Sequence, residues 1–355
     1  MPTTTMPGRP DGGSSAAARP VERLRGLALA ILDDGVPAST RRPEVLEMAQ
    51  ILAAAGPGGL ARAEDIAAGE TLTPDGIAIS PTMAAMCAED FVRTIKFIRG
   101  LRAAIAGFHA REPGRPARVL YAGCGPLALL AVPVMAVVPV EEAIFTLLDI
   151  HPASIASAAA IMESLGLADR VAKLEAVDAG RYRIDANRPP DVIVVELMRA
   201  CLEAEPQVAV TRHLLAQAPG AALVPEEVRV ELALVDVSRE FDLRGAGHAG
   251  GEWRRDRVPV APVFVLNRET VASWEGAREQ RLPGPTVRIP DPLERRYQPL
   301  LFTVIRTHAD HVLKDYESGL TCPRTPSVEG AIAPGAAIRF DYELGARPRL
   351  RGIVL

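Results

Sequence analysis

Residues 118–130 read RVLYAGCGPLALL, and this stretch decides the fold class. An apolar run leads directly into Gly123 and Gly125, which is typical of a buried strand that ends in a tight turn before a helix. Glycine at both positions lets the backbone turn sharply and approach a ligand closely. The third glycine of a dinucleotide-binding fingerprint is absent, because Leu127 and Ala128 stand where it would fall. We therefore expect a nucleotide-type site without a pyrophosphate cradle.

Strand and helix patterns alternate along the chain that follows this turn. Residues 143–150 (AIFTLLDI), 170–178 (RVAKLEAVD) and 190–196 (PDVIVVE) are patterned as strands, and residues 152–167 (PASIASAAAIMESLGL) as a helix. Alternation of this kind favours a parallel α/β sheet of Rossmann-like type. The uncharged run Val119–Val140 is long enough to span a membrane. Its three prolines and two glycines argue against a membrane-spanning helix and favour a buried strand, a turn and a short helix.

The hydrophobic periodicity of the sequence differs on either side of this α/β segment. Three stretches upstream repeat apolar residues at helical spacing: 21–34, 42–56 and 84–108. Downstream of Pro225, short strand patterns with turns between them predict a β-rich domain, a barrel or a sandwich, and we expect the barrel-like form. We expect four regions: a disordered tail (1–20), a helical N-terminal region (21–112), a Rossmann-like domain (113–225) and a β-rich domain for substrate binding and dimerisation (226–355).

Composition limits the classes of partner. The 355 residues carry 40 Lys and Arg against 44 Asp and Glu, a net charge of −4, and only 4% aromatic residues. This balance argues against nucleic acid as a partner. The four cysteines contain no CxxC pair, so neither a metal site nor a disulfide framework is predicted. The first 20 residues lack the apolar core of a signal peptide, and we expect a cytoplasmic protein.

Two acidic residues follow successive predicted strands. Asp149 ends the segment AIFTLLDI, where a carboxylate can accept both ribose hydroxyls, and Asp178 follows the next strand, where it can accept from an adenine amino group. Alone, each could be a helix cap or a loop acid. Together with Gly123 and Gly125 they are typical of class I methyltransferases that bind S-adenosylmethionine, and a dehydrogenase is the alternative.

The segment VVELMRACLEAEPQVAVTRHLL (194–215) resembles the double-glutamate loop SEWMGYCLxYES of the protein arginine methyltransferase family. Glu196 and Glu205 match its two glutamates at the same separation, and Met198, Cys201 and Leu202 match between them. The family order is also the order expected here: N-terminal helices, a Rossmann domain and a β-barrel. The resemblance implies that Glu196 and Glu205 are the catalytic pair.

A second motif of the family lies upstream. Residues 88–94 (AEDFVRT) resemble its KDxVRT motif, which implies that Arg93 holds the carboxylate of S-adenosylmethionine. Without the resemblance, the alternative is that Arg93 is a surface arginine of a helix.

The chemistry of a guanidino acceptor suits two carboxylates. A guanidinium is planar and forked, so paired charge-assisted hydrogen bonds can hold it with one nitrogen aimed at the methyl donor. On a straight helix, nine residues turn by about 900°, so Glu196 and Glu205 would face opposite ways. Both can serve one ligand only if the segment is a bent loop. The alternative is a solvated acidic helix, in which Glu203 shares the face of Glu196.

Departures from the family point to the acceptor. Leu197, Arg199 and Ala200 replace the Trp, Gly and Tyr of the loop, and the N-terminal YFxxY motif is missing. The family's Thr-His-Trp loop has two weak counterparts, His308 in Thr307-His308-Ala309 and the segment YESGLTCP (316–323). A lone histidine in a strand is more often structural.

The lost aromatics favour a small guanidine over a peptide. The resemblance implies a free L-arginine N-methyltransferase that forms N-omega-methyl-L-arginine in a bacterial secondary-metabolite pathway, with Met198, Arg199 and His308 as candidate substrate-binding residues and Arg199 facing the acceptor's carboxylate. The alternatives are a protein arginine N-methyltransferase, a small-molecule O- or C-methyltransferase, and a non-catalytic scaffold. The family's homodimers use an arm in the barrel, for which residues 238–280 are long enough.

Overall fold

A computed structural model describes residues 20–57, 66–241, 255–274 and 280–355 of the chain. The predicted disordered tail therefore lies outside the described residues, except for Pro20, which begins helix α1 (Pro20–Leu32). Of the predicted dimerisation arm, residues 242–254 and 275–279 also lie outside them.

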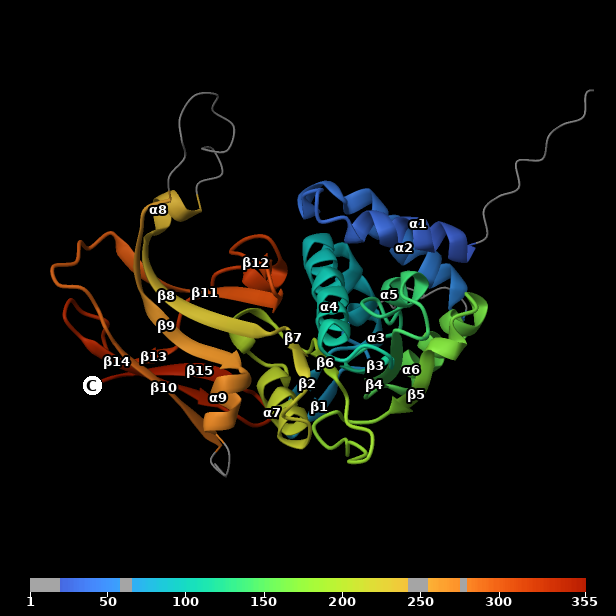
Figure 1. Ribbon diagram of the computed structural model, residues 1–355. Coiled ribbons are helices and arrows are strands. Elements are labelled where there is room, and N and C mark those ends of the chain that lie inside the picture. Colours follow the sequence, from blue (N-terminus) through green and yellow to red (C-terminus); the bar gives the residue numbers. More distant parts are fainter. Residues whose placement is uncertain (1–19, 58–65, 242–254, 275–279) are drawn as a thin grey trace, which may run out of the picture.

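A five-stranded parallel sheet forms the α/β part of the molecule (Figure 1). Its strand order is β5-β4-β3-β6-β7, and every neighbouring pair runs parallel. The chain order reverses between β3 and β6, which is the position where open α/β sheets bind ligands. The Rossmann-like prediction is thereby confirmed. The strands are β3 (Ala117–Ala122), β4 (Ala143–Asp149), β5 (Val171–Ala176), β6 (Val192–Val195) and β7 (Ala222–Val224).

The segment 118–130 forms most of strand β3 and the turn after it, as predicted. Gly123 and Gly125 have φ angles of +79° and +63°, which favour glycine. A side chain at position 123 would also collide with Leu197. The turn leads to the short helix α5 (Val132–Val137), so the uncharged run is a strand, a turn and a short helix. Within the described ranges, no helix has both the length and the apolar character needed to cross a bilayer.

Further helices pack around the sheet. They are α2 (Arg42–Ala55), α4 (Phe91–Arg111), α6 (Pro152–Ser164) and α7 (Gln207–Gln217). The predicted continuous helix over 84–108 is wrong, because it is divided into α3 (Pro81–Met86), the 3₁₀ turn η2 (Cys87–Glu89) and α4. Asp90 makes the break, since its side chain accepts from the backbone N–H of Arg93 and caps α4.

The N-terminal region (21–112), predicted as helical, is not helical throughout. Residues 71–78 form an antiparallel hairpin of β1 (Thr71–Thr73) and β2 (Gly76–Ala78). The sequence Thr-Pro-Asp-Gly (73–76), which spans the turn, is a strong turn signal, because proline fixes φ and glycine accepts a backbone conformation unfavourable for other residues. Gly76 has a φ of +151°.

The C-terminal part is β-rich, as predicted, and forms two four-stranded sheets (Figure 1). One has the order β12-β11-β8-β9 and the other β10-β14-β15-β13. Among the described residues, no hydrogen-bonded strand pair joins the two sheets, so the predicted barrel-like form of this domain is not confirmed. The strands are β8 (Glu227–Asp236), β9 (Arg257–Asn267), β10 (Arg281–Arg288), β11 (Tyr297–His308), β12 (His311–Leu313), β13 (Val328–Glu329), β14 (Ala337–Glu343) and β15 (Arg349–Val354). Two short helices are α8 (Val237–Glu240) and α9 (Arg268–Ser273).

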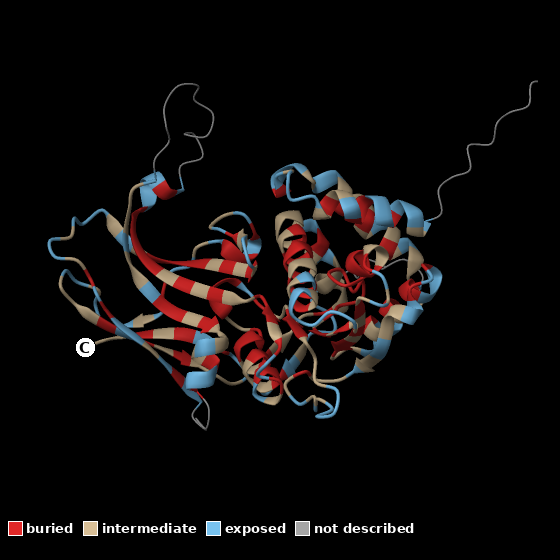
Figure 2. Ribbon diagram, in the orientation of Figure 1, coloured by how far each residue is buried: buried red, intermediate tan, exposed pale blue. Residues whose placement is uncertain are grey.

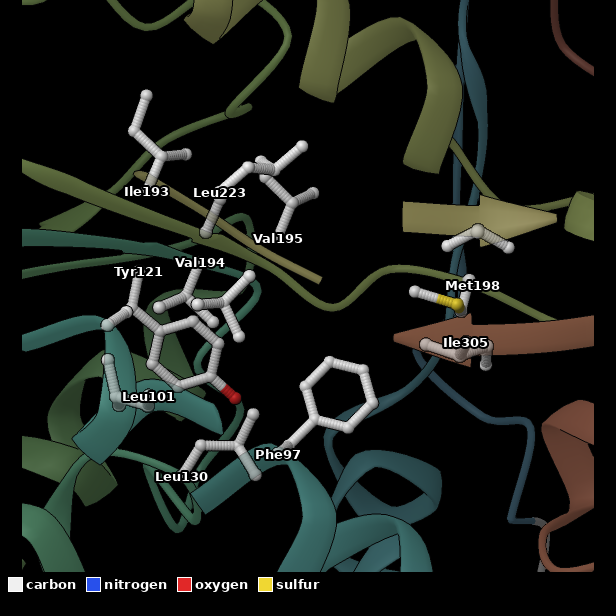
Figure 3. Packing of buried hydrophobic residues seen from close by; sticks show 14 of the residues in the cluster. Phe97, Leu101, Tyr121, Leu130, Ile193, Val194, Val195, Met198, Leu223 and Ile305 are labelled. Atoms are coloured by element: carbon white, nitrogen blue, oxygen red, sulfur yellow. The ribbon is translucent and has the colours of Figure 1, made fainter. Parts of the chain in front are cut away.

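One hydrophobic core runs through both parts of the molecule (Figure 2). It joins residues of α4, the parallel sheet and the antiparallel strands, among them Phe97, Leu101, Tyr121, Val194 and Ile305 (Figure 3). Helix α4 lies between the two parts and touches β11 at Gly100, where an added Cβ would lie 2.7 Å from the Cβ of Thr307. The α/β part and the β-rich part are therefore packed as one unit through α4.

Candidate active site

A cavity opens at the carboxyl ends of β3, β4 and β6, beside the switch point of the sheet. It brings together residues that are far apart in the sequence and that the motifs singled out. Its lining includes every predicted donor-binding residue and both predicted catalytic residues: Arg93, Gly123, Gly125, Asp149, Asp178, Glu196 and Glu205. Met198 lines it as well.

Asp149 is held in place by the backbone around it. Its Oδ2 accepts a hydrogen bond from the Gly125 N–H at 2.9 Å, and its Oδ1 accepts one from the His151 N–H at 2.9 Å. Each carboxylate oxygen has a second lone pair, so the group can still accept two hydroxyl donors from the cavity. This arrangement suits the ribose-binding role predicted for Asp149.

Asp178 lies in the cavity wall between Val177 and Ala179. Its Oδ1 accepts from the Gly180 N–H at 2.9 Å, and the Nε of Arg181 lies 3.5 Å from its Oδ2. The carboxylate is therefore fixed by a turn at the end of β5. Its predicted contact with an adenine amino group stays a prediction.

The loop that carries the two glutamates is bent and not helical. Cys201, Leu202 and Ala204 have φ angles of +61°, +60° and +66°, and only a short 3₁₀ turn, η4 (Ala200–Leu202), interrupts it. Non-glycine residues with positive φ are uncommon and need support from their surroundings. The bend brings Glu196 and Glu205 to the same cavity, so the solvated-helix alternative is excluded.

Contacts from three sides support this loop. The Cys201 N–H donates to Thr303 Oγ1 of β11 at 2.9 Å, and Tyr342 of β14 donates its hydroxyl to the Leu202 carbonyl at 2.5 Å. The Ala204 N–H donates to the Pro348 carbonyl at 2.8 Å, and the Ala204 carbonyl accepts from the Ile77 N–H at 2.8 Å. The β-rich part and the β1–β2 hairpin therefore hold the loop's strained conformation.

Glu196 has one satisfied and one unsatisfied oxygen. Its Oε2 is ion-paired with the Nη2 of Arg93, whereas its Oε1 is buried and has no hydrogen-bond partner among the residues that the structure describes. The side chain is 8% exposed. An unpaired anionic oxygen in a buried position is costly, so its natural complement is an N–H donor that enters the cavity.

Glu205 is buried to a similar degree, with 7% of its side chain exposed. Its Oε1 accepts from the Nε of Arg199 at 3.1 Å. Burial, and then the negative charge of Glu196, raise the pKa of Glu205 to about 7. Near neutral pH this carboxyl group can therefore both hold and release a proton.

The guanidinium of Arg93 is ion-paired with Glu196. The contact with the donor's carboxylate that the resemblance implies for Arg93 stays a prediction. Burial alone would lower the pKa of Arg93, but the negative charge of Glu196 raises it above its ordinary value. Arg93 is therefore a permanent cation in the cavity wall, next to both predicted sites.

The three candidate substrate-binding residues differ in position. Met198 lines the cavity, whereas Arg199 does not and covers Glu205 with a side chain that is 44% exposed. His308 lies at the end of β11, where its Nδ1 is 3.5 Å from Glu226 Oε2, and it does not line the cavity. Its neighbour Thr307 donates its hydroxyl to the Lys96 carbonyl at 2.8 Å, a contact between β11 and α4.

Sequence reasoning missed several polar lining residues, among them Thr73, Cys87 and His151. Thr73 could have been found through the Thr-Pro-Asp-Gly turn signal, which marks the hairpin. His151 follows Asp149 by two residues, and its Nε2 lies 3.2 Å from Thr71 Oγ1 of the hairpin. Nothing in the local sequence indicates that contact, because the two residues are 80 positions apart.

No protein-family model matches the sequence, and no curated protein matches it. Among solved structures, the chain is similar to the Trypanosoma brucei PRMT1 enzyme-prozyme heterotetrameric complex with AdoHcy, at 12% identity and a TM-score of 0.46, over 74% of this chain and 87% of that chain. It is also similar to Arabidopsis thaliana protein arginine methyltransferase 10, at 13% identity and a TM-score of 0.43, over 69% of this chain and 84% of that chain. At these values the chemistry of the cavity has to be read from its own residues.

Proposed function

We propose that this protein is an S-adenosylmethionine-dependent methyltransferase that acts on a guanidino nitrogen. The observation that carries the proposal is the buried, unpartnered Oε1 of Glu196 in the same cavity as Glu205. Two carboxylates with one orphaned acceptor oxygen match the several N–H donors of a guanidinium. A hydroxyl or carbon acceptor would leave most of this acceptor capacity unused.

The donor side of the cavity fits an adenosyl group. Asp149 retains acceptor capacity for ribose hydroxyls, Asp178 can accept from the adenine amino group, and Gly123 and Gly125 line the same cavity. Arg93 is the cation available to the donor's carboxylate. When bound, S-adenosylmethionine supplies a methyl group that its sulfonium already activates.

The chain's own residues then have two tasks. Glu196 and Glu205 hold the guanidinium in one plane and fix the distance and direction of the reacting nitrogen, which supplies much of the rate enhancement. Glu205, with a pKa of about 7, is placed to accept the proton that the nitrogen loses. Glu196 keeps Arg93 as its counter-ion and acts as the electrostatic partner of the cation.

We further propose free L-arginine as the acceptor. The loop lacks the aromatic residues of the family motif, and Arg199 lies over Glu205 at the position of the motif's glycine. An exposed arginine at this place repels a basic peptide and attracts the carboxylate of a free amino acid. These features support a small acidic or zwitterionic guanidine over an arginine within a basic peptide.

The experiment is a methyl-transfer assay with two acceptors. The protein is incubated with methyl-labelled S-adenosylmethionine and either L-arginine or an arginine-rich peptide. The masses of the products are then measured by mass spectrometry. We expect methylated L-arginine and little modified peptide. Calorimetry with S-adenosylmethionine is run beside it. Absence of donor binding would overturn the enzyme proposal, and modification of the peptide alone would overturn the choice of acceptor.

A further inference from the structure

We propose that the β1–β2 hairpin (71–78) is a positioning element that ties the Glu205 loop to the donor side of the cavity, with Gly76 as its central residue. The inference rests on the proposed function and deepens it. Residues 71–78 belong to none of the sequence motifs that point to the activity. The hairpin contacts both the Glu205 loop and the residues proposed to bind the donor.

The hairpin meets the Glu205 loop through its backbone. The Ile77 N–H donates to the Ala204 carbonyl at 2.8 Å, directly before Glu205. At Gly76 the two backbones approach so closely that an added Cβ would lie 2.7 Å from the Pro206 nitrogen and 2.9 Å from the Ala204 oxygen. Because both atoms belong to the backbone, they cannot move aside without displacing the Glu205 loop.

The other end of the hairpin meets the donor side. Thr71 Oγ1 lies 3.2 Å from His151 Nε2, and His151 Nδ1 lies 3.4 Å from Asp149 Oδ1. The backbone N–H of His151 donates to the same Asp149 oxygen. A chain of three side chains therefore links the hairpin to the carboxylate proposed to bind ribose.

The strands of the hairpin also line the cavity, and its turn lies beside Asp178. Thr73 and Ala78 are lining residues. Asp75, at the turn, lies against Gly180 together with Asp178, because a Cβ added to Gly180 would be 3.0 Å from Asp75 Oδ2 and 3.3 Å from Asp178 Oδ1. The hairpin thus covers the space between the donor residues and the Glu205 loop.

The Glu205 loop needs such a restraint. Ala204 holds a φ of +66°, a conformation that costs free energy in a non-glycine residue and persists only when its neighbours enforce it. Of the two backbone hydrogen bonds of Ala204, one comes from the hairpin. A displaced hairpin would therefore move Glu205, while the hydrophobic core of the α/β part and the β-rich part stays intact.

The test compares two glycine variants. Gly76→Ala introduces the backbone collision beside Glu205, and Gly114→Ala is its control, because Gly114 also has a positive φ (+101°) but has no atom within 4 Å of the added Cβ. In Gly76→Ala we expect kcat for L-arginine methylation to fall by about 10²-fold, the size of a small misplacement of a reacting group. We expect its affinity for S-adenosylhomocysteine to stay at the wild-type level.

A second variant probes the donor end without a collision. Thr71→Val removes the contact with His151, and we expect S-adenosylmethionine to bind between about threefold and tenfold more weakly, the size of one hydrogen bond, with kcat at saturation unchanged. If the hairpin had only a structural role, both variants would lose thermal stability. Gly76→Ala would then not lower kcat at unchanged donor affinity, and Thr71→Val would not weaken donor binding at unchanged kcat.

The experiments distinguish failure of the proposed function from failure of the positioning role of the hairpin. A wild-type protein that transfers no methyl group to arginine overturns the proposed function. Titration of the Glu205 carboxyl by NMR needs no turnover, and we expect its pKa to move away from about 7 in Gly76→Ala and to stay there in Gly114→Ala. Equal kcat values or equal Glu205 titrations in the two variants overturn the positioning role.

Discussion

At the scale of single residues, the site is defined by what its two glutamates contact. Glu196 has a guanidinium on one oxygen and no partner on the other, and Glu205 lies under Arg199. The motif predicted that both residues would face one ligand, and the cavity contains both. The counter-ion of Glu196 could not be predicted, because Arg93 and Glu196 are 103 positions apart and their pairing depends on the packing of α4 against the sheet.

Replacement of the first glutamate tests its role directly. In Glu196→Gln the carboxylate charge is lost while shape is kept, and we expect guanidino methylation to fall by about 10²-fold, as for the loss of one preorganised electrostatic group. Donor affinity should stay close to wild type in calorimetry. Glu203→Gln, in the same loop but outside the cavity lining, is the control and should methylate at the wild-type rate. Product at an unchanged rate from Glu196→Gln would point to an O- or C-methyl acceptor.

The second glutamate makes stability depend on pH. The pKa of Glu205 is raised from its ordinary value of 4.5 to about 7, so between these values the folded protein holds a proton that the unfolded chain releases. The free energy of unfolding therefore falls as pH rises through this window, by about 3 kcal/mol from this one group. Glu205→Gln should lack this fall in urea unfolding at pH 5 and pH 8. If wild type and variant lose the same stability between the two pH values, Glu205 does not have the raised pKa.

At the scale of elements, apolar pattern and turn signals differ in how well they predict structure. Strands β3, β4 and β6 are continuous apolar runs, and the sequence predicts them within one or two residues because burial on both faces of a parallel sheet demands such runs. The β1–β2 hairpin is too short for a periodic pattern, and its position depends on contacts with residues 151 and 204. The break before α4 has a local signal, because Asp90 is a typical N-cap residue and accepts from the Arg93 N–H.

Asp90 provides a test of that break. One of its oxygens caps α4, and the other accepts from Ser318 Oγ at 2.6 Å and the Gly319 N–H at 2.9 Å. Asp90→Ala should lower the free energy of unfolding by about 2 kcal/mol, because it removes a cap and leaves two donors unpaired. Glu269→Ala, an exposed acid in the first turn of α9, is the control and should change stability little. Equal effects in chemical unfolding would show that the Asp90 contacts are unimportant.

At the scale of the whole molecule, α4 connects the α/β part with the β-rich part. Gly100→Ala places a Cβ 2.7 Å from Thr307 Cβ and 3.1 Å from the His308 backbone nitrogen, so we expect a loss of about 1–3 kcal/mol in unfolding free energy from overpacking. In the same helix, Gly107→Ala meets its nearest atom at 3.8 Å and should gain up to about 1 kcal/mol from helix propensity. Stabilisation of both variants would contradict the close contact between α4 and β11.

The whole arrangement was only partly predictable from sequence. Changes in periodicity predict the order of helices, parallel sheet and β-rich part. The positions of Asp149 and Asp178 directly after predicted strands indicated that both would lie in the cavity. For the β-rich part the sequence leaves a barrel and a sandwich both open, because the choice depends on which strand edges pair, and period-two patterns do not specify the partner strand. The position of His308 away from the cavity depends on the same pairing, since β11 pairs with β8 and β12.

The most direct test of the central claim is the location of the transferred methyl group. The protein is supplied with S-adenosylmethionine carrying a ¹³C-labelled methyl group and with L-arginine, and the product is fragmented by tandem mass spectrometry. The account predicts that the label lies on a terminal guanidino nitrogen and that Glu196→Gln gives almost none of this product. A label on the α-amino or carboxyl group, or no product from a protein that binds the donor, would contradict it.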